Sequence, residues 1–440
     1  METILDFFSF NNVNVIYVTI GSMLLTSSAA IVGTFTFLKR KALVGDAVSH
    51  SILPGICLAF MLSGDKNPLY LIIGAFITGW LSLIIIDLIT SKSKIKEDSA
   101  IALILSVFFG IGILLLTIIQ KSGNAEQTGL DHFLFGNAAA LVGSDLVTFT
   151  IVALILLIVV YLFFKELTLL AFDEDFAKTI GMPIRLIELI LTTLTVMAVV
   201  IGIQAVGIVL MAAMLITPVA AARFWTDKIK VLILLAAIFG AFSGLSGAFV
   251  SYAAPAMPTG PWIVVVISTI AFISFFFAPK KGIISRAIKQ RNVVQQINDE
   301  NILKSLYQLG EQDQEYYTNR TIEDIIQRRP FNTSVLKKGL KRLKKQGYME
   351  SKSGTWQFTK EGKNKGQRTV KLHRLWETYL TKYLRIAPDH VHDDADTIEH
   401  FLTPELESRL EQLLEYPELD PHDSKIPYQK NKIKNNSTQV

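Results

Sequence analysis

Residues 69–90 read LYLIIGAFITGWLSLIIIDLIT and carry a single charged side chain, that of Asp87. An α-helix rises about 1.5 Å per residue, so a run of this length crosses the ~30 Å hydrocarbon core of a membrane. The stretch therefore predicts a membrane-spanning helix, and it excludes a purely soluble protein.

Comparable apolar runs recur through the first two thirds of the chain. An odd number of spans would put the two ends of the membrane part on opposite sides. We predict a helical membrane bundle of about nine spans, with its least certain connection near Ile201 and Gly202. The spans lie at residues 13–38, 43–63, 69–90, 99–119, 143–164, 184–200, 203–222, 231–252 and 262–279.

Charge separates the membrane part from the rest of the chain. Residues 1–280 hold 15 of the 43 Lys and Arg and 16 of the 38 Asp and Glu, so the remaining 160 residues of the 440 carry the larger share. That second part has the composition of a soluble protein. The chain is therefore predicted to be a membrane bundle followed by a soluble domain.

The basic residues of the loops predict the orientation, because Lys and Arg accumulate in cytoplasmic loops. With the N-terminus outside, only Lys66 and Lys121 fall in outer loops, and the soluble domain lies in the cytoplasm. The inner loops then hold Lys39, Arg40, Lys41, Lys92, Lys94, Lys96, Lys165, Lys178, Arg185, Arg223, Lys228, Lys230, Lys280, Lys281, Arg286, Lys289 and Arg291.

Small residues predict where the spans pack closely. Gly240, Gly244 and Gly247 share one helix face, and residues 21–34 are rich in Gly, Ala and Ser. Such faces let membrane helices approach one another, and they carry no information on substrate.

Few ionisable side chains lie inside the spans, where a charge is retained mostly for function. Asp46 and His50 are four residues apart and so share a helix face. A carboxylate with an imidazole is an incomplete ligand set for Mn²⁺, Fe²⁺ or Zn²⁺. The alternative is a hydrogen-bonded pair at a helix end. Asp87 is expected to reach the interface, Glu188 has no predicted role, and His132 is a weaker candidate ligand in an outer loop.

The order of landmarks resembles a family. KRKALVGDAVSHSILPGICLAF at 39–60, LDHFLFGN at 130–137, FDEDFAKTIGMP at 172–183 and GIQAVGIVLMAAMLITPVAAARFWTD at 202–227 resemble the permease subunits of bacterial ABC importers for manganese, zinc and iron. The resemblance covers about residues 10–280. It implies a second permease, cytoplasmic ATPases and an extracytoplasmic metal-binding protein. It also implies that Asp46 and His50 line the metal path.

The same resemblance implies that residues 172–183 dock on the ATPase, although a plain interfacial loop would look similar. No G-x-x-x-x-G-K-[ST] motif occurs in the chain, so ATP hydrolysis is expected from a partner and the chain is not itself an enzyme. The coupling residues implied are Phe172, Asp173, Glu174, Phe176 and Gly181.

The soluble part predicts three helices and a β-hairpin around Ser353 and Gly354, an order typical of a winged helix-turn-helix. In the third helix, Leu336, Leu340 and Leu343 form an apolar stripe after a cap region at Thr333 and Ser334. Its basic residues could contact DNA, lie on anionic lipid, or simply be solvated. They are Lys337, Lys338, Lys341, Arg342, Lys344 and Lys345.

Histidines and carboxylates gather further along. They occur at helical spacing without thiolates, which suits Mn²⁺, Fe²⁺ or Zn²⁺, although two amphipathic helices with surface acids could give the same pattern. The set is His373, Glu377, His392, Asp396, Glu399 and His400.

Residues 298–427 resemble the diphtheria-toxin-repressor family of iron- and manganese-dependent regulators. By position, His373, Glu377 and His392 match one metal site of that family, and the remaining three match the other. Asp396 stands where the iron regulators have Cys, which favours manganese. The first-helix ligand falls at Asn301, whose neutral amide would weaken the second site.

These observations predict a divalent-metal permease with a cytoplasmic metal-sensing domain. Two alternatives remain, a membrane-tethered DNA-binding regulator and a permease whose tail only dimerises. The predicted parts are the membrane domain 1–280, a helical connector 281–297, the winged-helix domain 298–365, the metal-binding and dimerisation helices 366–427, and a polar tail 428–440.

Overall fold

The computed structural model describes residues 2–64, 68–121, 141–254, 257–386 and 403–428. The chain divides into two compact units, residues 1–286 and 287–440. Each unit has its own buried apolar cores, so each is described separately.

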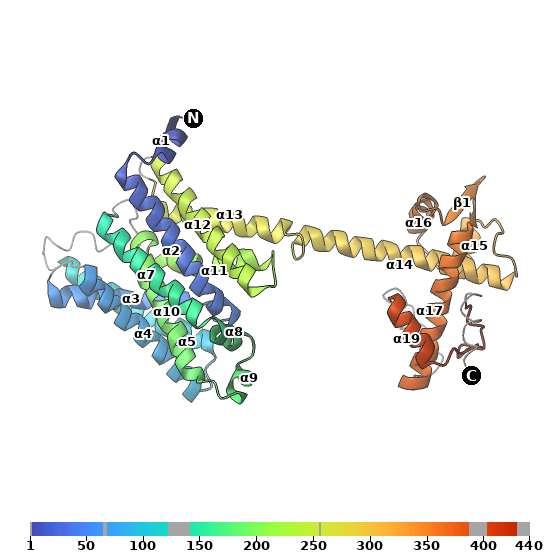
Figure 1. Cartoon of the computed structure of the whole chain (residues 1–440), viewed down its shortest axis with the longest axis horizontal. Coiled ribbons are helices and arrows are strands. Elements are labelled where there is room, and N and C mark those ends of the chain that lie inside the picture. The colour runs from blue at the N-terminus through green and yellow to red at the C-terminus, as the bar shows by residue number, and fades with distance from the viewer. Residues whose placement is uncertain (1, 65–67, 122–140, 255–256, 387–402, 429–440) are drawn as a thin grey trace. The chain divides into compact units, whose positions relative to one another are not determined.

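The first unit is an all-helical bundle (Figure 1). A short amphipathic helix, α1, precedes it, and two short helices, α8 and α9, interrupt it. The helices are α1 (Glu2–Ser9), α2 (Val13–Leu38), α3 (Val44–Ser63), α4 (Pro68–Lys92), α5 (Glu97–Lys121), α7 (Gly143–Leu162), α8 (Phe164–Phe172), α9 (Glu174–Thr179), α10 (Ile184–Val206), α11 (Ile208–Arg223), α12 (Ile229–Ala253) and α13 (Thr259–Phe277).

Each predicted span corresponds to one helix. Among the described residues, eight helices are long and apolar enough to cross a membrane, and α11 is a shorter apolar helix. The expected connection at Ile201 and Gly202 is wrong, because α10 continues to Val206 and the break falls at Gly207. Gly207 has φ +89°, a left-handed conformation that is unstrained only for glycine.

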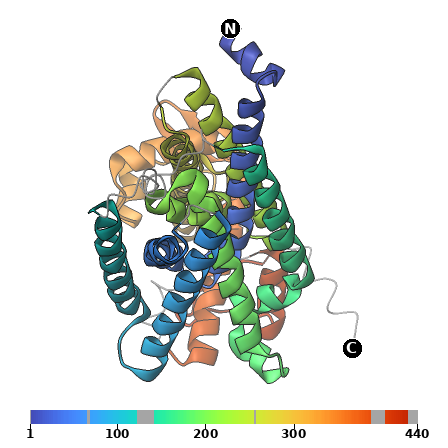
Figure 2. The same cartoon turned by 90° about the vertical axis from the view of Figure 1, so that its left-hand side faces the viewer.

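The predicted small-residue face is a helix contact in the structure. Helix α12 packs along α2, and the two run side by side in Figures 1 and 2. A Cβ at Gly240 or Gly244 would lie 2.6 or 2.8 Å from a backbone carbonyl oxygen of α2. The Thr26 hydroxyl of α2 also donates to the Gly240 carbonyl at 2.7 Å. Close packing of the two backbones therefore depends on these glycines.

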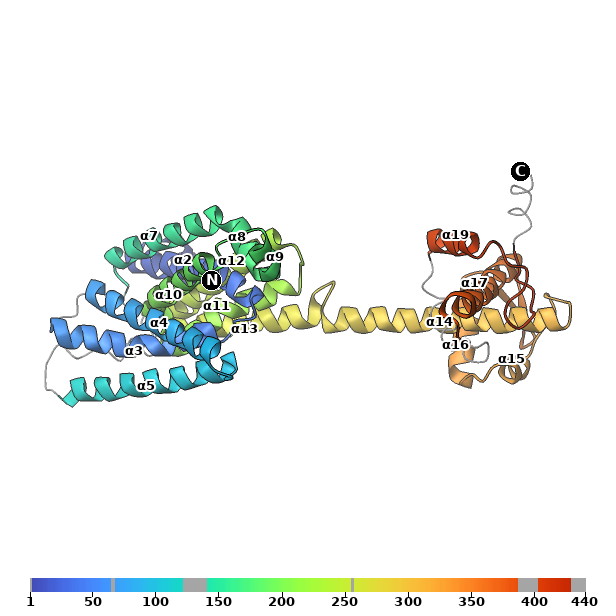
Figure 3. The ribbon, with the colours of Figure 1, turned by 90° about the horizontal axis from the view of Figure 1, so that it is seen from below.

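Helix α3 is the most buried of the long spans and packs against α4, α5 and α11, as Figure 3 shows for α4 and α5. Gly55 of α3 faces Gly74 of α4, where an added Cβ would meet the Gly74 carbonyl oxygen at 2.1 Å. Pro54 lies inside the same helix and removes one of its backbone hydrogen bonds. The sequence thus places α3 in the interior of the bundle.

The second unit contains the predicted helices and hairpin. Met349 pairs with Phe358 and Lys352 with Thr355 in the antiparallel hairpin. The predicted connector and first tail helix form one continuous helix, α14. The elements are α14 (Ile283–Gln312), which begins at the end of the first unit, α15 (Ile322–Arg328), α16 (Thr333–Lys345), β1 (Met349–Lys352), β2 (Thr355–Phe358), α17 (Lys360–Leu384) and α19 (Pro404–Leu413).

The core of this unit joins α14, α15, α16 and the hairpin. Leu336, Leu340 and Leu343 of α16 are buried in it together with Ile302 and Leu306 of α14, as the apolar stripe predicted. The helix is capped one residue earlier than expected, because the Asn332 side chain accepts from the Ser334 amide. A second small core, around Leu375 and Leu410, holds α19 against α17.

Candidate functional site

Asp46 and His50 lie in the first two turns of α3. The His50 Nε2 atom is 3.5 Å from Asp46 Oδ1. The side chain of His50 is 16% exposed and that of Asp46 is 38% exposed. The Phe109 ring of α5 meets the imidazole edge-on, with the ring centroids 4.8 Å apart. His50 Nδ1 is buried and has no hydrogen-bond partner among the described residues. Within the described part of the chain, the pair thus has one buried imidazole nitrogen uncommitted.

Asp46 and His50 alone supply only two of the ligands that a metal site would need. No group of three or more His, Cys, Asp or Glu side chains that could hold a metal occurs within the described residues. A carboxylate and an imidazole suit a divalent cation in passage, whereas tight binding needs more ligands. His132, the other candidate, lies outside the described residues.

The predicted coupling segment folds as the end of α8, a one-residue break and α9. Asp173 ends α8 and caps α9, since its Oδ1 accepts from the Phe176 amide at 2.9 Å. Phe172 and Phe176 are 60% and 53% exposed. Gly181, with φ +78°, turns the chain into α10. The segment therefore presents one aromatic ring at the end of α8 and a second on the short, capped helix α9.

Glu174 fixes this helix through ion pairs. Lys178, one turn further along, lies 2.8 Å from Glu174, and Lys39 at the end of α2 lies 3.8 Å away. The hydrogen bond from Lys178 lowers the pKa of Glu174 most, burial opposes it, and the charges of Lys39, Lys178 and Lys41 lower the pKa further. Glu174 thus remains ionised at neutral pH.

The basic face of α16 is partly engaged. Lys337, Lys338, Lys341, Lys344 and Lys345 are exposed, as expected for a surface that contacts a polyanion or water. Arg342 is different, because its guanidinium donates to both carboxylate oxygens of Asp299 on α14. Five of the six predicted contact residues therefore remain available on the surface.

In the tail, the structure brings together two of the six predicted metal ligands. His373 Nε2 and Glu377 Oε1 lie 2.9 Å apart on α17, and both side chains are buried. His392, Asp396, Glu399 and His400 lie outside the described residues. Asn301, the position expected to weaken the second site, is buried on α14 and accepts from Arg329 at 3.1 Å.

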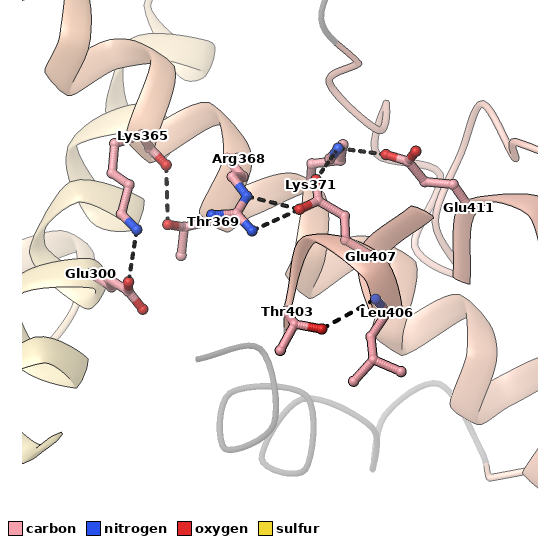
Figure 4. Close-up of polar contacts among 9 residues, drawn as sticks. All are labelled: Glu300, Lys365, Arg368, Thr369, Lys371, Thr403, Leu406, Glu407 and Glu411. Carbon is pink, nitrogen blue, oxygen red and sulfur yellow. Dashed lines mark hydrogen bonds and ion pairs between the residues drawn. The ribbon is translucent and has the colours of Figure 1, made fainter. Parts of the chain in front are cut away.

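Sequence reasoning missed an ionic cluster that joins α17 to α19 (Figure 4). Lys371 donates to Glu407 and Glu411 at 2.5 Å each, and Arg368 contacts Glu407 at 2.8 Å. The side chains of Lys371 and both glutamates are no more than 8% exposed. Arg368 and Lys371 are three residues apart in the sequence, so they were visible as neighbours on one face of α17. Their acidic partners could not be identified, because they lie more than 30 positions away.

The fold and these sites define a polytopic helical membrane protein with an acid–imidazole pair on an interior helix and a separate helical unit. Residues 12–278 match the ABC 3 transport family, and the chain belongs to that family. Residues 359–428 match the metal binding and dimerisation domain of iron dependent repressors.

Similar proteins include the manganese transport system membrane protein MntC of Bacillus subtilis, 39% identical over 91% of this chain and 92% of the relative. The zinc transport system membrane protein TroC of Treponema pallidum is 42% identical over 63% of this chain and 93% of its own length. The structure of PsaBC from Streptococcus pneumoniae in complex with Fab is 34% identical. The structural match covers 66% of this chain and 99% of the solved chain, with a TM-score of 0.58.

Proposed function

We propose that this chain is the permease subunit of an ATP-driven importer of a divalent metal, with manganese as the first candidate and with a tail that senses the metal. The observation that carries the proposal is the Asp46–His50 pair on the buried helix α3 of an ABC 3 family bundle. Among the described residues, no third ligand is near enough to trap the ion. Such a pair can bind a cation in passage and release it again.

The path requires partners. Residues 172–181 would dock Phe172 and Phe176 on a cytoplasmic ATPase, and an extracytoplasmic protein would deliver the metal. A second permease, identical or related, would complete the ligand set around Asp46 and His50. The distribution of Lys and Arg supports an N-terminus outside and a cytoplasmic tail in a bacterial inner membrane.

Manganese is favoured over iron and zinc for two reasons. The predicted tail ligands are carboxylates and imidazoles, with Asp396 where a thiolate would favour softer metals. A relative that matches 91% of this chain, and so extends into the tail, is named for manganese. The zinc-named relative is a reason to test zinc beside it.

The tail has three candidate roles. In the first, metal at His373, Glu377 and the ligands of 392–400 orders or pairs the tails and slows transport when internal metal is high. Such feedback requires that the metal bind one transporter state more tightly than the other. In the second, the exposed lysines of α16 bind DNA, and the chain is a membrane-tethered regulator. In the third, the tail serves only for dimerisation.

The deciding experiment is uptake by the whole complex in proteoliposomes. Permease, ATPase and binding protein are reconstituted, and uptake of Mn²⁺, Fe²⁺ and Zn²⁺ is measured with ATP and different internal metal concentrations. We expect ATP-dependent uptake that prefers Mn²⁺ and slows as internal Mn²⁺ rises. No uptake of any of the three would contradict the transport function.

Two variants separate the roles of the tail. Glu377→Gln should abolish slowing by internal metal, whereas Glu350→Gln on the exposed hairpin should preserve it. Slowing that persists in Glu377→Gln would contradict feedback through this site. Metal-dependent, sequence-specific DNA binding by the whole chain in nanodiscs would favour the regulator instead.

A further inference from the structure

Lys39 holds an unusual place at the end of α2. Its side chain is 8% exposed, so its ammonium group is largely removed from water. A desolvated charge must be paired, and Lys39 has two carboxylate partners on two different elements. Glu188 of α10 lies 2.5 Å away, and Glu174 of α9 lies 3.8 Å away. Lys39 therefore connects the coupling segment to two membrane helices.

The backbone around Lys39 leads directly to the metal path. Arg40 has φ +61°, a conformation more typical of glycine, and the Lys41 amide donates to the Thr36 carbonyl at 3.1 Å. Together these close the end of α2 as a Schellman-type turn. The Val44 amide then donates to the Lys41 carbonyl at 3.3 Å, and α3 begins. Only one short, hydrogen-bonded turn thus separates Lys39 from the helix that carries Asp46 and His50.

A cavity lies beside the ion pair. It measures about 610 Å³ and is lined from the turn after α2 and from α4, α5 and α10, among other places, by Lys39, Lys41, Asp87, Glu97, Arg185 and Glu188. Close-packed interiors resist displacement, whereas a cavity leaves room for side chains and helix ends to move. The Lys39–Glu188 pair borders this cavity, so the Lys39 side chain has room to move beside Glu188 without unpacking a core.

We propose that Lys39 is a positioning residue that transmits movement of the coupling segment at α9 to α2, α10 and the start of α3. This inference rests on the proposed function, because it assumes that α9 docks on an ATPase. A displacement of α9 would change the Lys39–Glu174 separation, and the buried ammonium would redistribute between its two partners. The turn at 39–43 would carry that change to Asp46.

A purely structural role for Lys39 makes a different prediction. Loss of a structural ion pair lowers the amount of folded complex, so metal transport and ATP hydrolysis fall in the same proportion. Loss of a transmitting contact lowers the metal transported for each ATP hydrolysed. This ratio is therefore the readout, measured in proteoliposomes with the complete complex.

The main variant is Lys39→Met with Glu188→Gln, which removes both charges of the pair, so that Glu188 is not left charged without Lys39. We expect ATP hydrolysis to continue and the ratio of metal to ATP to fall about tenfold, as for residues that couple two sites. Glu174→Gln removes the contact of Lys39 with the coupling segment, together with the Glu174–Lys178 pair within α9, and should lower the ratio in the same direction. Lys41→Met is the matched control, since its pair with Glu97 at 3.6 Å is exposed on both sides.

An unchanged ratio in the double variant would overturn the proposal and leave Lys39 as a structural residue. A fall in the double variant without any fall in Glu174→Gln would overturn the link to α9. An equal fall in Lys41→Met would show a general effect of charge at this end of the bundle and would also overturn it. If the wild-type complex moves no metal, the proposed function fails first, and the role of Lys39 fails with it.

Discussion

The Arg342 guanidinium on α16 holds the Asp299 carboxylate on α14 through two hydrogen bonds, 2.6 and 3.0 Å long. Burial raises the pKa of Asp299 despite the opposing effect of Arg342, which shows how strongly the site disfavours an unpaired carboxylate. One basic residue of α16 therefore belongs to the interior of its unit, while its lysine neighbours face outward.

Removal of Arg342 should destabilise the second unit. Arg342→Ala leaves Asp299 buried without its partner, and we expect a loss of about 2 kcal/mol in the free energy of opening. Lys341→Ala, next in sequence and exposed, should change it by less than about 0.5 kcal/mol. Hydrogen exchange of α14 and α16 in the whole chain measures both. Equal effects of the two substitutions would contradict the conclusion that Arg342 belongs to the interior of the unit while Lys341 does not.

Helix α3 should tolerate no side chain at Gly55. Gly55→Ala places a methyl group within 2.1 Å of the Gly74 carbonyl oxygen, so α3 and α4 must separate. Because the contact is overpacked, we expect the free energy of unfolding to fall by several kcal/mol and the yield of folded protein to drop clearly. Gly110→Ala on α5 is the matched control, because nothing lies within 4 Å of its added Cβ. Thermal stability in detergent compares the two, and similar melting temperatures would refute the close contact.

Much of this fold could be predicted because its signals are local. Apolar runs fix the spans, and Leu336, Leu340 and Leu343 fix the buried face of α16 by their spacing alone. The break at Gly207 could not be placed, because Gly202 and Gly207 look alike in sequence. Only packing decides which of them leaves the helix: Gly202 stays in α10, where a Cβ would meet the Met211 side chain at 2.4 Å.

Long-range ion pairs were beyond reach for a related reason. Glu188 had no role in the sequence because its partner, Lys39, lies 149 positions earlier. Arg342 was grouped with its lysine neighbours, although it is paired with Asp299. Charge type and spacing predict a helix face, whereas the choice among many carboxylates depends on how helices meet. The Asp46–His50 pair could be found because both residues lie on one helix.

Transport should depend on both members of that pair. Asp46→Asn keeps the shape of the side chain but removes the charge, and His50→Ala removes the imidazole. We expect each to lower uptake of Mn²⁺ at least about tenfold, as the loss of a ligand or its close partner does at metal sites. Asp87→Asn is the control, an exposed carboxylate near the end of α4. Uptake by Asp46→Asn equal to that of Asp87→Asn would contradict a metal path at α3.

The contact between α17 and α19 should weaken in acid through Glu407. Desolvation tends to raise the pKa of Glu407, but hydrogen bonds from Lys371 and Arg368 outweigh it and leave the pKa below the ordinary value of 4.5. A carboxylate whose pKa is lower in the folded state contributes stability above its unfolded pKa. That contribution is lost as the pH falls through the folded pKa, so the window lies below 4.5.

Hydrogen exchange of α19 in the whole chain, between pH 5.5 and 3, should therefore show a loss of protection that Glu407→Gln reduces. Glu405→Gln, an exposed carboxylate on the same helix, should keep the wild-type pH dependence. The comparison also tests the pairing itself, because Lys371 keeps only Glu411 when Glu407 is neutral. If Glu407→Gln and the wild type lose protection with the same pH dependence, Glu407 is not the group that titrates, and the ionic cluster does not determine how α19 is held.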